Sequence, residues 1–461
     1  SHLFIIGKSI HEMNVSATVG ARNDPEKYAR NLVPTWGWPA ADIPFTSGLN
    51  GTQWESAIPT GRLAAANEEQ VLDYLNKVVQ YESNTPAEWM KNIMHFGGGG
   101  NSYEQGLFRN YLTNYENIAV DTCFGGYVHS FFKTSTDPIQ LNLSDSISLL
   151  IEEGVSLMTF FGHASSTGFD QNIDSPSAYS NNGKYPVLIG NSCYTGNIHL
   201  GEGQSTSEEF VLAPGAGVIA FMAKGDQGVP PYLNFFTENF YKRIFQKNYG
   251  ASIGFCMVEA VKDFQGSSND LFKYNTALTF GLHGDPALRI NSHPLPDFSV
   301  QADRVFFEPE QVTAQMDSLK VKVVLTNLGK AVNAPFGLEM IRHYPSGIDS
   351  SLNVEIDGLH FRDTVTFTWA VDRVHGVGLN TFDLFVDYPA LLVEEMEEIS
   401  NNIIQGKELL ITSGDLIPVY PPEFAVIPNA SVTLSASTGF PFLPERDYVI
   451  QLDTTSYFNS P

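Results

Sequence analysis

A histidine and a cysteine each follow a short apolar run. His163 comes just after residues 155–161, and Cys193 comes just after residues 185–190. Short, continuous apolar runs are typical of strands that are buried on both faces, as in a parallel sheet. Ligands of open α/β sheets bind at the carboxyl ends of such strands. If the two strands are neighbours, both side chains therefore face one crevice.

The chemistry that suits this pair is nucleophilic catalysis. A thiolate is the nucleophile, and a nearby imidazole either lowers the thiol pKa or carries a proton to the leaving amine. The backbone N–H groups of Cys193 and Ala164 lie at the predicted strand ends, where they are candidates for binding a tetrahedral oxyanion. The alternative is a buried thiol and a capping histidine without chemistry, because a sequence does not show whether two side chains touch.

The cysteine count favours a free thiol over a structural role. The chain has three cysteines, and an odd, sparse set without a CxxC pair fits neither a disulfide framework nor a zinc site. Cys123 and Cys256 have no accompanying histidine signal, so we interpret both as packing residues.

The composition limits the classes of molecule that the chain is expected to bind. The 461 residues include 26 Lys and Arg against 51 Asp and Glu, a net charge of −25. An acidic surface repels phosphate backbones, which argues against a nucleic-acid partner, and no run of 18 apolar residues indicates a membrane span. The chemistry requires no cofactor, while the many carboxylates leave structural calcium as a candidate ligand. The chain opens inside an apparent strand, so we expect a segment from inside a longer protein.

The chain is too long for one core, so two or three domains are expected. Residues 1–292 alternate apolar runs with amphipathic helices at residues 67–83 and 144–153, and residues 218–222 are a further strand candidate. This alternation predicts an α/β sandwich with a mostly parallel sheet.

Beyond residue 292 the sequence is typical of strands and turns. Three strand candidates are rich in alternating apolar residues: residues 319–326, 366–369 and 381–387. We predict an immunoglobulin-like β-sandwich over residues 293–412. A proline-rich linker follows, and residues 413–461 are interpreted as the start of a further β domain, cut off at Pro461, with strands at residues 431–435 and 448–452.

The order of motifs resembles the gingipain family of caspase-like cysteine peptidases. In that family one strand ends in Gly-His-Gly-Ser, and a later strand ends in the nucleophilic cysteine; here the separation is 193 − 163 = 30 residues. Other family landmarks are matched by residues 60–69, 207–220 and 280–288. The resemblance covers about residues 55–292. It implies a caspase-like α/β fold with Cys193 and His163 as the catalytic dyad.

The chain departs from the family pattern at two places. The family glycine after the histidine is Ala164, which keeps the backbone N–H. The family glutamate that orients the histidine has no counterpart in the matching residues 95–101, and Glu104 and Asp121 are the two candidates for the orienting acid. Without an orienting group the imidazole is loosely held and the rate falls by orders of magnitude. No acidic residue can be assigned to the base of a primary specificity pocket, so trypsin-like cleavage is not predicted.

Within the family the chain is most similar to the PorU-type sortase-like peptidases of the type IX secretion system. That resemblance implies a place at the outer surface of a Bacteroidota-type bacterium and no membrane span of its own. It also implies a substrate cargo with a C-terminal sorting signal and a PorV-like barrel as partner. A resemblance to CARDB-like adhesion domains supports the β-sandwich and is carried by residues 327–329, 387, 394, 398, 401 and 402. The rival hypothesis is an inactive gingipain-fold scaffold that binds secretion machinery or cargo.

Other polar features have simpler interpretations than chemistry. The glycine run 97–100 predicts a turn beside the cleft. We interpret His199 as a solvated loop residue and residues 394–398 as an exposed acidic turn. Calcium-ligand spacing is present at Asp170, Asn172 and Asp174. The glycine and final glutamate of an EF-hand loop are missing there, so a solvated loop is the default interpretation.

Overall fold

The computed structural model describes most of the chain. The residues outside the description are 12–23, 137–143, 172, 174, 266–269, 291–292, 415, 423, 429–430, 439–446, 452, 454, 456 and 458–461. The chain divides into two compact units. The first comprises Ser1–Asp297, Asn327–Asn333 and Gly358–Phe361. The second comprises Phe298–Thr326, Ala334–Asp357 and Arg362–Pro461.

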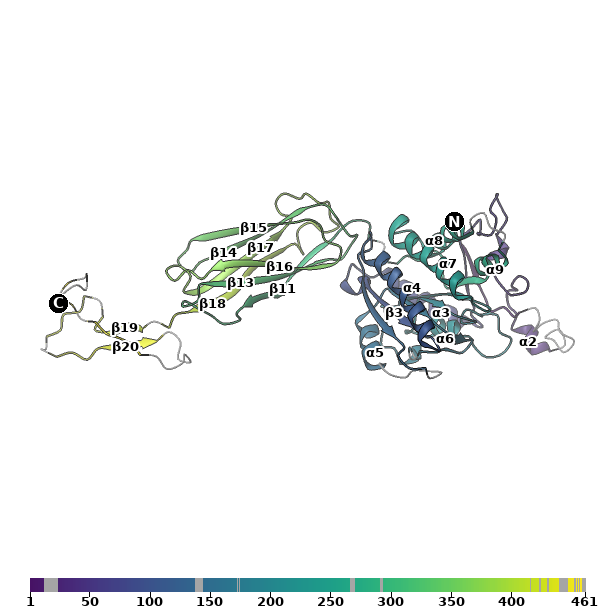
Figure 1. Cartoon of the computed structure of the whole chain (residues 1–461), viewed down its shortest axis with the longest axis horizontal. Coiled ribbons are helices and arrows are strands. Elements are labelled where there is room, and N and C mark those ends of the chain that lie inside the picture. The colour runs from purple at the N-terminus through teal and green to yellow at the C-terminus, as the bar shows by residue number, and fades with distance from the viewer. Residues whose placement is uncertain are drawn as a thin grey trace. The chain divides into compact units, whose positions relative to one another are not determined.

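An eight-stranded sheet forms the centre of the first unit (Figure 1). In spatial order its strands are β1 (Leu3–Ile6), β2 (Thr60–Leu63), β10 (Phe280–His283), β9 (Ala220–Lys224), β8 (Val187–Asn191), β5 (Leu157–Phe161), β3 (Asn92–Gly97) and β4 (Tyr127–Phe132). Every neighbouring pair is parallel except β9 with β10. The predicted mostly parallel sheet is confirmed. The carboxyl ends of β9, β8, β5 and β3 therefore meet at one edge.

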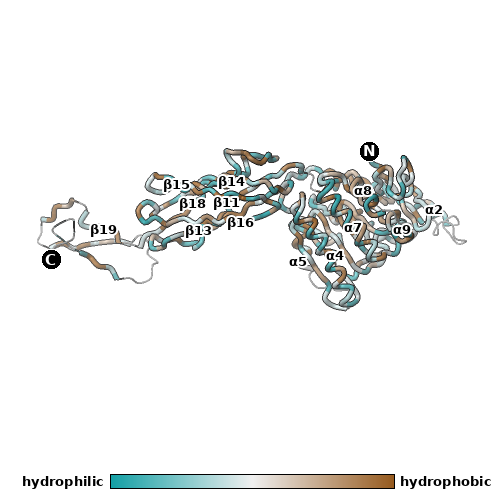
Figure 2. The backbone as a smooth tube through the Cα atoms, turned by 45° about the horizontal axis from the view of Figure 1, so that its top comes forward, coloured by the Kyte–Doolittle hydropathy of each residue, from teal (hydrophilic) through white to brown (hydrophobic). Residues whose placement is uncertain are grey.

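Helices cover both faces of this sheet. One core contains side chains of α4 (Ser102–Val120), α7 (Pro230–Lys242), α8 (Ile253–Gln265) and α9 (Leu271–Thr279). The other contains side chains of α3 (Glu68–Glu82), α5 (Ser144–Glu153) and α6 (Thr206–Leu212). Successive strand residues point to opposite faces, so Leu157 enters the first core and Met158 the second. Figure 2 shows the resulting mixture of apolar and polar turns along α4 and α7.

The helices predicted from periodicity are present. Helix α3 follows Asn67, whose side chain accepts a hydrogen bond from the N–H of Gln70 at 3.0 Å and so caps the first turn. Helix α5 has the predicted bounds. None of the described helices is both long and apolar enough to cross a membrane.

The second unit consists mainly of two sheets. One contains β11 (Phe298–Glu308), β13 (Ser318–Asn327) and β16 (Arg362–Ala370). The other contains β12 (Val312–Thr313), β18 (Ile403–Thr412), β17 (Gly378–Val386), β14 (Phe336–His343) and β15 (Asp349–Ile356). Aromatic side chains join the sheets, since the Phe382 ring of β17 lies 6.0 Å from Trp369 of β16 and 5.4 Å from Phe307 of β11. The alternation along β13 buries Leu319, Val321, Val323 and Leu325.

The predicted strands of the last segment are largely wrong. Strand β19 (Leu416–Tyr420) pairs with β20 (Ser435–Thr438), so only Ser435 of predicted residues 431–435 is in a strand. Residues 448–451 are irregular, and residue 452 lies outside the described residues. A strand is stabilised by packing one face against neighbours, whereas Val449 is 86% exposed.

The acidic segment 394–398 of the second unit is not uniformly exposed, because Glu395 is buried. Its carboxylate accepts hydrogen bonds from the N–H of Phe298 at 2.5 Å and from Nδ2 of Asn402 at 2.7 Å. Burial, with the charges of Glu398 and Asp387 adding to it, raises the pKa of Glu395 from 4.5 to about 7. The prediction of an exposed turn is therefore wrong at Glu395.

This raised pKa makes the second unit less stable as the pH rises from about 5 to 8. Between its unfolded and folded pKa values the Glu395 carboxyl holds a proton in the native state that the unfolded chain has lost. We expect the free energy of unfolding to fall by up to about 3 kcal/mol across this window. The measurement is the hydrogen-exchange free energy of β18, in wild type and in Glu395→Gln. An identical pH dependence in both proteins would contradict the prediction.

Candidate functional site

The strands that carry His163 and Cys193 are neighbours. Strand β5 pairs in parallel with β8, with Phe161 opposite Asn191, and the N–H of Gly162 donates to the carbonyl of Asn191 at 3.2 Å. His163 and Cys193 each stand two residues beyond this last pair. The structure therefore brings both residues to the same edge of the sheet.

The Cys193 thiol is held by the loop that follows β9. The N–H of Gly228 donates to Sγ at 3.3 Å, and the thiol lies 3.7 Å from the carbonyl oxygen of Gly228. The next residue, Tyr194, has a φ of 60° and donates its N–H to the carbonyl of Asp226 at 2.9 Å. In the part of the chain that the structure describes, no hydrogen bond joins the thiol to His163. Such contacts are often long before a substrate binds.

The His163 imidazole has a carboxylate partner, Glu104. Nε2 of His163 lies 2.9 Å from Oε2 of Glu104, which also accepts the N–H of Gly100 at 2.9 Å. The hydrogen bond from His163 is the main reason that the pKa of the Glu104 carboxyl lies below its usual value. A carboxylate on Nε2 favours a proton on that nitrogen and leaves Nδ1 to exchange a proton with the thiol.

Only one of the two candidate orienting acids lies at the site. Glu104 is in the first turn of α4, where Asn101 caps the helix by accepting the N–H of Glu104 at 3.0 Å. Asp121 is the C-cap of the same helix, about 25 Å away at 1.5 Å per residue. The acid is absent from residues 95–101 because the helix, rather than the end of β3, presents it.

A second acid, Asp170, lies buried behind His163. The residues after His163 form a short hairpin of β6 (Ala164–Ser165) and β7 (Gly168–Phe169), closed by the N–H of Asp170 donating to the carbonyl of His163 at 2.9 Å. The Asp170 carboxylate accepts the N–H of Gly99 at 2.8 Å and lies 3.5 Å from Nζ of Lys133. It is only 9% exposed, so the prediction of a solvated loop is wrong there. Asn172 and Asp174 lie outside the described residues.

Two glycines make room for this carboxylate. A Cβ at Gly98 would stand 2.0 Å from Oδ1 of Asp170, and a Cβ at Gly162 would stand 2.7 Å from the same atom. Burial raises the pKa of the Asp170 carboxyl. The glycine run thus lets a strand-end backbone approach a buried acid.

Among the described residues, no group of three His, Cys, Asp or Glu side chains is arranged to hold a metal ion.

Comparison with known families decides the class of this domain. The model of peptidase family C25 matches residues 1–291. The chain belongs to peptidase family C25. The gingipain-type α/β fold with a mostly parallel sheet, expected for the first unit, is the fold observed. No curated protein matches the chain.

Solved structures that are similar to this chain include two gingipain structures and one cell-surface domain. The arginine-specific cysteine proteinase gingipain R (RgpB) is 13% identical with a TM-score of 0.48, covering 89% of this chain and 84% of that one. The complex of the Porphyromonas gingivalis RgpB pro- and mature domains is 12% identical with a TM-score of 0.49, covering 89% and 85%. A domain of a putative cell surface protein from Methanosarcina acetivorans is 20% identical with a TM-score of 0.19, covering 25% and 92%.

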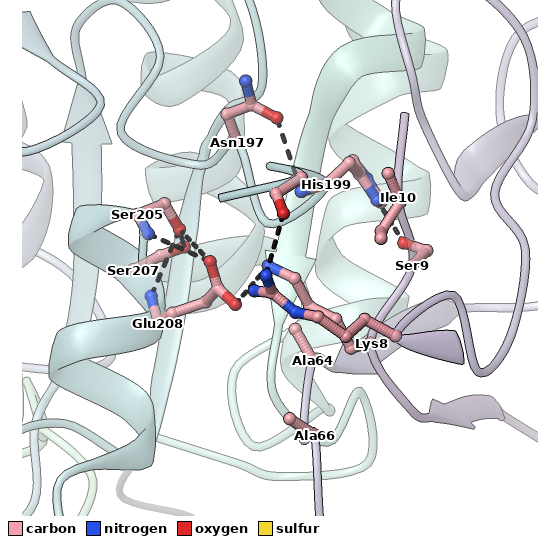
Figure 3. A network of polar contacts seen from close by, with 12 residues as sticks. Lys8, Ser9, Ile10, Ala64, Ala66, Asn197, His199, Ser205, Ser207 and Glu208 are labelled. Carbon is pink, nitrogen blue, oxygen red and sulfur yellow. Dashed lines mark hydrogen bonds and ion pairs between the residues drawn. The ribbon is translucent and has the colours of Figure 1, made fainter. Parts of the chain in front are cut away.

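His199 is not the solvated loop residue that the sequence predicts for this C25 domain. It is buried, its Nδ1 lies 2.5 Å from Oγ of Ser9, and burial lowers its pKa to about 4. Figure 3 shows the surrounding network, in which Lys8 forms a 2.5 Å ion pair with Glu208. These contacts tie the loop after Cys193 to the end of β1, so His199 has a structural role.

The other two cysteines of the C25 chain do not lie at the dyad. All three cysteines are free, and Cys256 is buried in α8. Burial raises the pKa of the Cys256 thiol to about 12, which suppresses the reactive thiolate. Cys123 is half-buried.

Proposed function

We propose that this C25 chain is a cysteine peptidase with Cys193 as nucleophile, His163 as proton carrier and Glu104 as the group that orients His163. The observation that carries the proposal is the 2.9 Å contact between Glu104 and His163. It lies at the sheet edge from which Cys193 also emerges, and it supplies the third member that a working dyad needs.

The reaction follows from these positions. The Cys193 thiol gives its proton to Nδ1 of His163, and the sulfur attacks the peptide carbonyl carbon. The N–H groups of Cys193 and Ala164 hold the resulting oxyanion; Ala164 is not among the residues with positive φ. His163 then gives the proton to the leaving amine as the C–N bond breaks. Water or an acceptor amine releases the acyl group from sulfur.

The biological setting in the proposal is the type IX secretion system. A PorU-type peptidase at the outer-membrane surface would process the C-terminal sorting signal of cargo beside a PorV-like barrel. The two-sheet second unit supports an immunoglobulin-like, CARDB-like domain of the kind found on surface proteins. Cargo that is still processed when Cys193→Ala replaces the wild-type protein would exclude this setting.

One observation favours the scaffold as a second candidate. The described contacts of the Cys193 thiol are with Gly228, a geometry that an inactive thiol shares. A scaffold of gingipain fold would bind secretion machinery or cargo through the same edge without cleaving it.

Covalent labelling separates the two candidates. A peptidyl acyloxymethyl ketone should label wild type at Cys193, and Cys193→Ala and His163→Ala should abolish labelling. Cys256→Ala is the matched control, because the buried Cys256 thiol should contribute nothing to the labelling. Wild type that stays unlabelled across a varied peptide panel would leave the scaffold as the function.

A further inference from the structure

Two adjoining cavities lie beside the nucleophile, each with a volume of about 480 Å³. They share four lining residues: Trp38, Pro39, Asp226 and Gln227. Trp36, Leu271 and Phe272 complete much of the apolar wall of one cavity. We define the two cavities together as the tryptophan groove.

The tryptophan groove is lined by residues next to the catalytic thiol and to the loop that holds it. Tyr194, the residue after Cys193, lines one cavity, and Val229 lines the other. Val229 directly follows Gly228, whose N–H contacts Sγ of Cys193 at 3.3 Å. A chain attached to this sulfur as an acyl group therefore has the groove as its immediate surroundings.

The order of strands decides which half of a substrate reaches the groove. Strand β8, which carries Cys193, lies between β5 and β9. His163 follows β5 and must stand on the leaving-amine side in order to protonate that amine. Asp226 and Gln227 follow β9, on the opposite side of the nucleophile. The groove consequently faces the acyl half of the substrate, which precedes the scissile bond.

The lining of the groove fits an uncharged, flat or apolar group. Trp36, Trp38, Leu271 and Phe272 are between 58 and 73% exposed, which is unusual for large apolar side chains gathered at one place. The one acid among the described lining residues is Asp226. It forms an ion pair with the buried Lys224 and accepts a hydrogen bond from Nδ2 of Asn275 at 3.1 Å. Its charge is therefore balanced within the fold.

The loop that presents the two tryptophans is fixed before a substrate arrives. Trp36 and Ala41 exchange backbone hydrogen bonds of 3.0 and 3.3 Å. The buried Arg62 donates to the carbonyls of Val33 at 2.9 Å and Pro34 at 3.3 Å, at the base of the loop. A pre-ordered apolar wall loses little conformational freedom on binding.

We propose that the tryptophan groove is a specificity site that binds an aromatic or large apolar side chain of the substrate, located within a few residues before the scissile bond. The inference rests on the proposed peptidase function, because the groove is placed relative to the acyl group on Cys193. It identifies the preferred substrates by a side chain that precedes the scissile bond, and it makes no claim about the residue at the scissile bond itself.

The test uses matched peptidyl acyloxymethyl ketones on the full chain. The probes share the residue at the reactive ketone and carry either tryptophan or alanine at each of the three preceding positions. We expect tryptophan at one of these positions to raise the second-order labelling rate of wild type roughly 10- to 100-fold, the range for burying one large apolar side chain. Trp38→Ala and Phe272→Ala should lose this preference, so that the tryptophan and alanine probes label each variant at similar rates.

Tyr103→Ala is the control variant, because this residue of α4 is an exposed aromatic outside the groove. It should keep the wild-type preference. Equal labelling by tryptophan and alanine probes, or a preference that survives Trp38→Ala, would overturn the groove while leaving the peptidase intact. If no probe labels wild type, the peptidase proposal fails. Binding of the free peptides to Cys193→Ala, measured by isothermal titration calorimetry, then tests the groove alone. Equal affinity for tryptophan and alanine peptides would then overturn it.

Discussion

Glu104→Gln should lower the rate of Cys193 labelling by up to about 10⁴-fold, the loss that follows when the orienting acid of a catalytic triad is made neutral. The carboxylate of Glu104 contacts Nε2 of His163 at 2.9 Å, and it is the group that fixes the proton on that nitrogen. A neutral amide at the same place can donate as well as accept, so the ring is free to carry its proton on Nδ1, the wrong nitrogen for taking a proton from the thiol.

The measurement is the second-order rate of labelling by a peptidyl acyloxymethyl ketone across pH 5 to 9. Asp121→Asn provides a matched control on the same helix, since it makes the same chemical change at the far end of α4. Its rate should equal that of wild type. A Glu104→Gln rate within a few-fold of wild type, with the fold intact by circular dichroism, would remove Glu104 from the mechanism.

Elements defined by local pattern could be predicted from the sequence. The apolar runs before His163 and Cys193 are neighbouring central strands, because burial on both faces leaves a continuous apolar signal. Helices α3 and α5 follow the 3.6-residue period with clear ends. The tail strands were predicted by the same local reasoning and failed, since no core face covers residues such as Val449.

Contacts between residues that are far apart in the chain could not be predicted from the sequence. Glu104 and Asp121 both carry a carboxylate, so residue type does not distinguish them as candidates. The course of α4 brings Glu104, and not Asp121, to His163. In the sequence Asp170 resembles a solvated loop acid. The structure shows that Gly98 and Gly162 leave space for its carboxylate, because a Cβ at either position would collide with it. His199 is buried, and its Nδ1 hydrogen-bonds to Oγ of Ser9, which lies 190 residues away in the chain. Each of these depends on which strand ends share an edge, which local periodicity does not encode.

Arg62→Met should destabilise the first unit by about 3–5 kcal/mol, the usual result of removing one partner of a buried ion pair. The Arg62 side chain is fully buried, and its guanidinium contacts both carboxylate oxygens of Asp42, at 2.6 and 2.7 Å. It also donates to the carbonyl oxygens of Gly7 and Val33. Methionine fills a similar volume but leaves the carboxylate and these carbonyls without their donor.

The free energy of unfolding should be measured by urea denaturation of the full chain, with Lys27→Met as the control. Lys27 forms a 2.5 Å ion pair with Glu202 at the surface, where water screens the attraction and the pair adds little to stability. Arg62 also donates to the carbonyls at the base of the loop that carries Trp36 and Trp38. Arg62→Met should therefore lose the preference for tryptophan probes, measured at urea concentrations where the variant is still folded. If Arg62→Met is no less stable than Lys27→Met, then neither the loop nor the order of the groove depends on this buried pair.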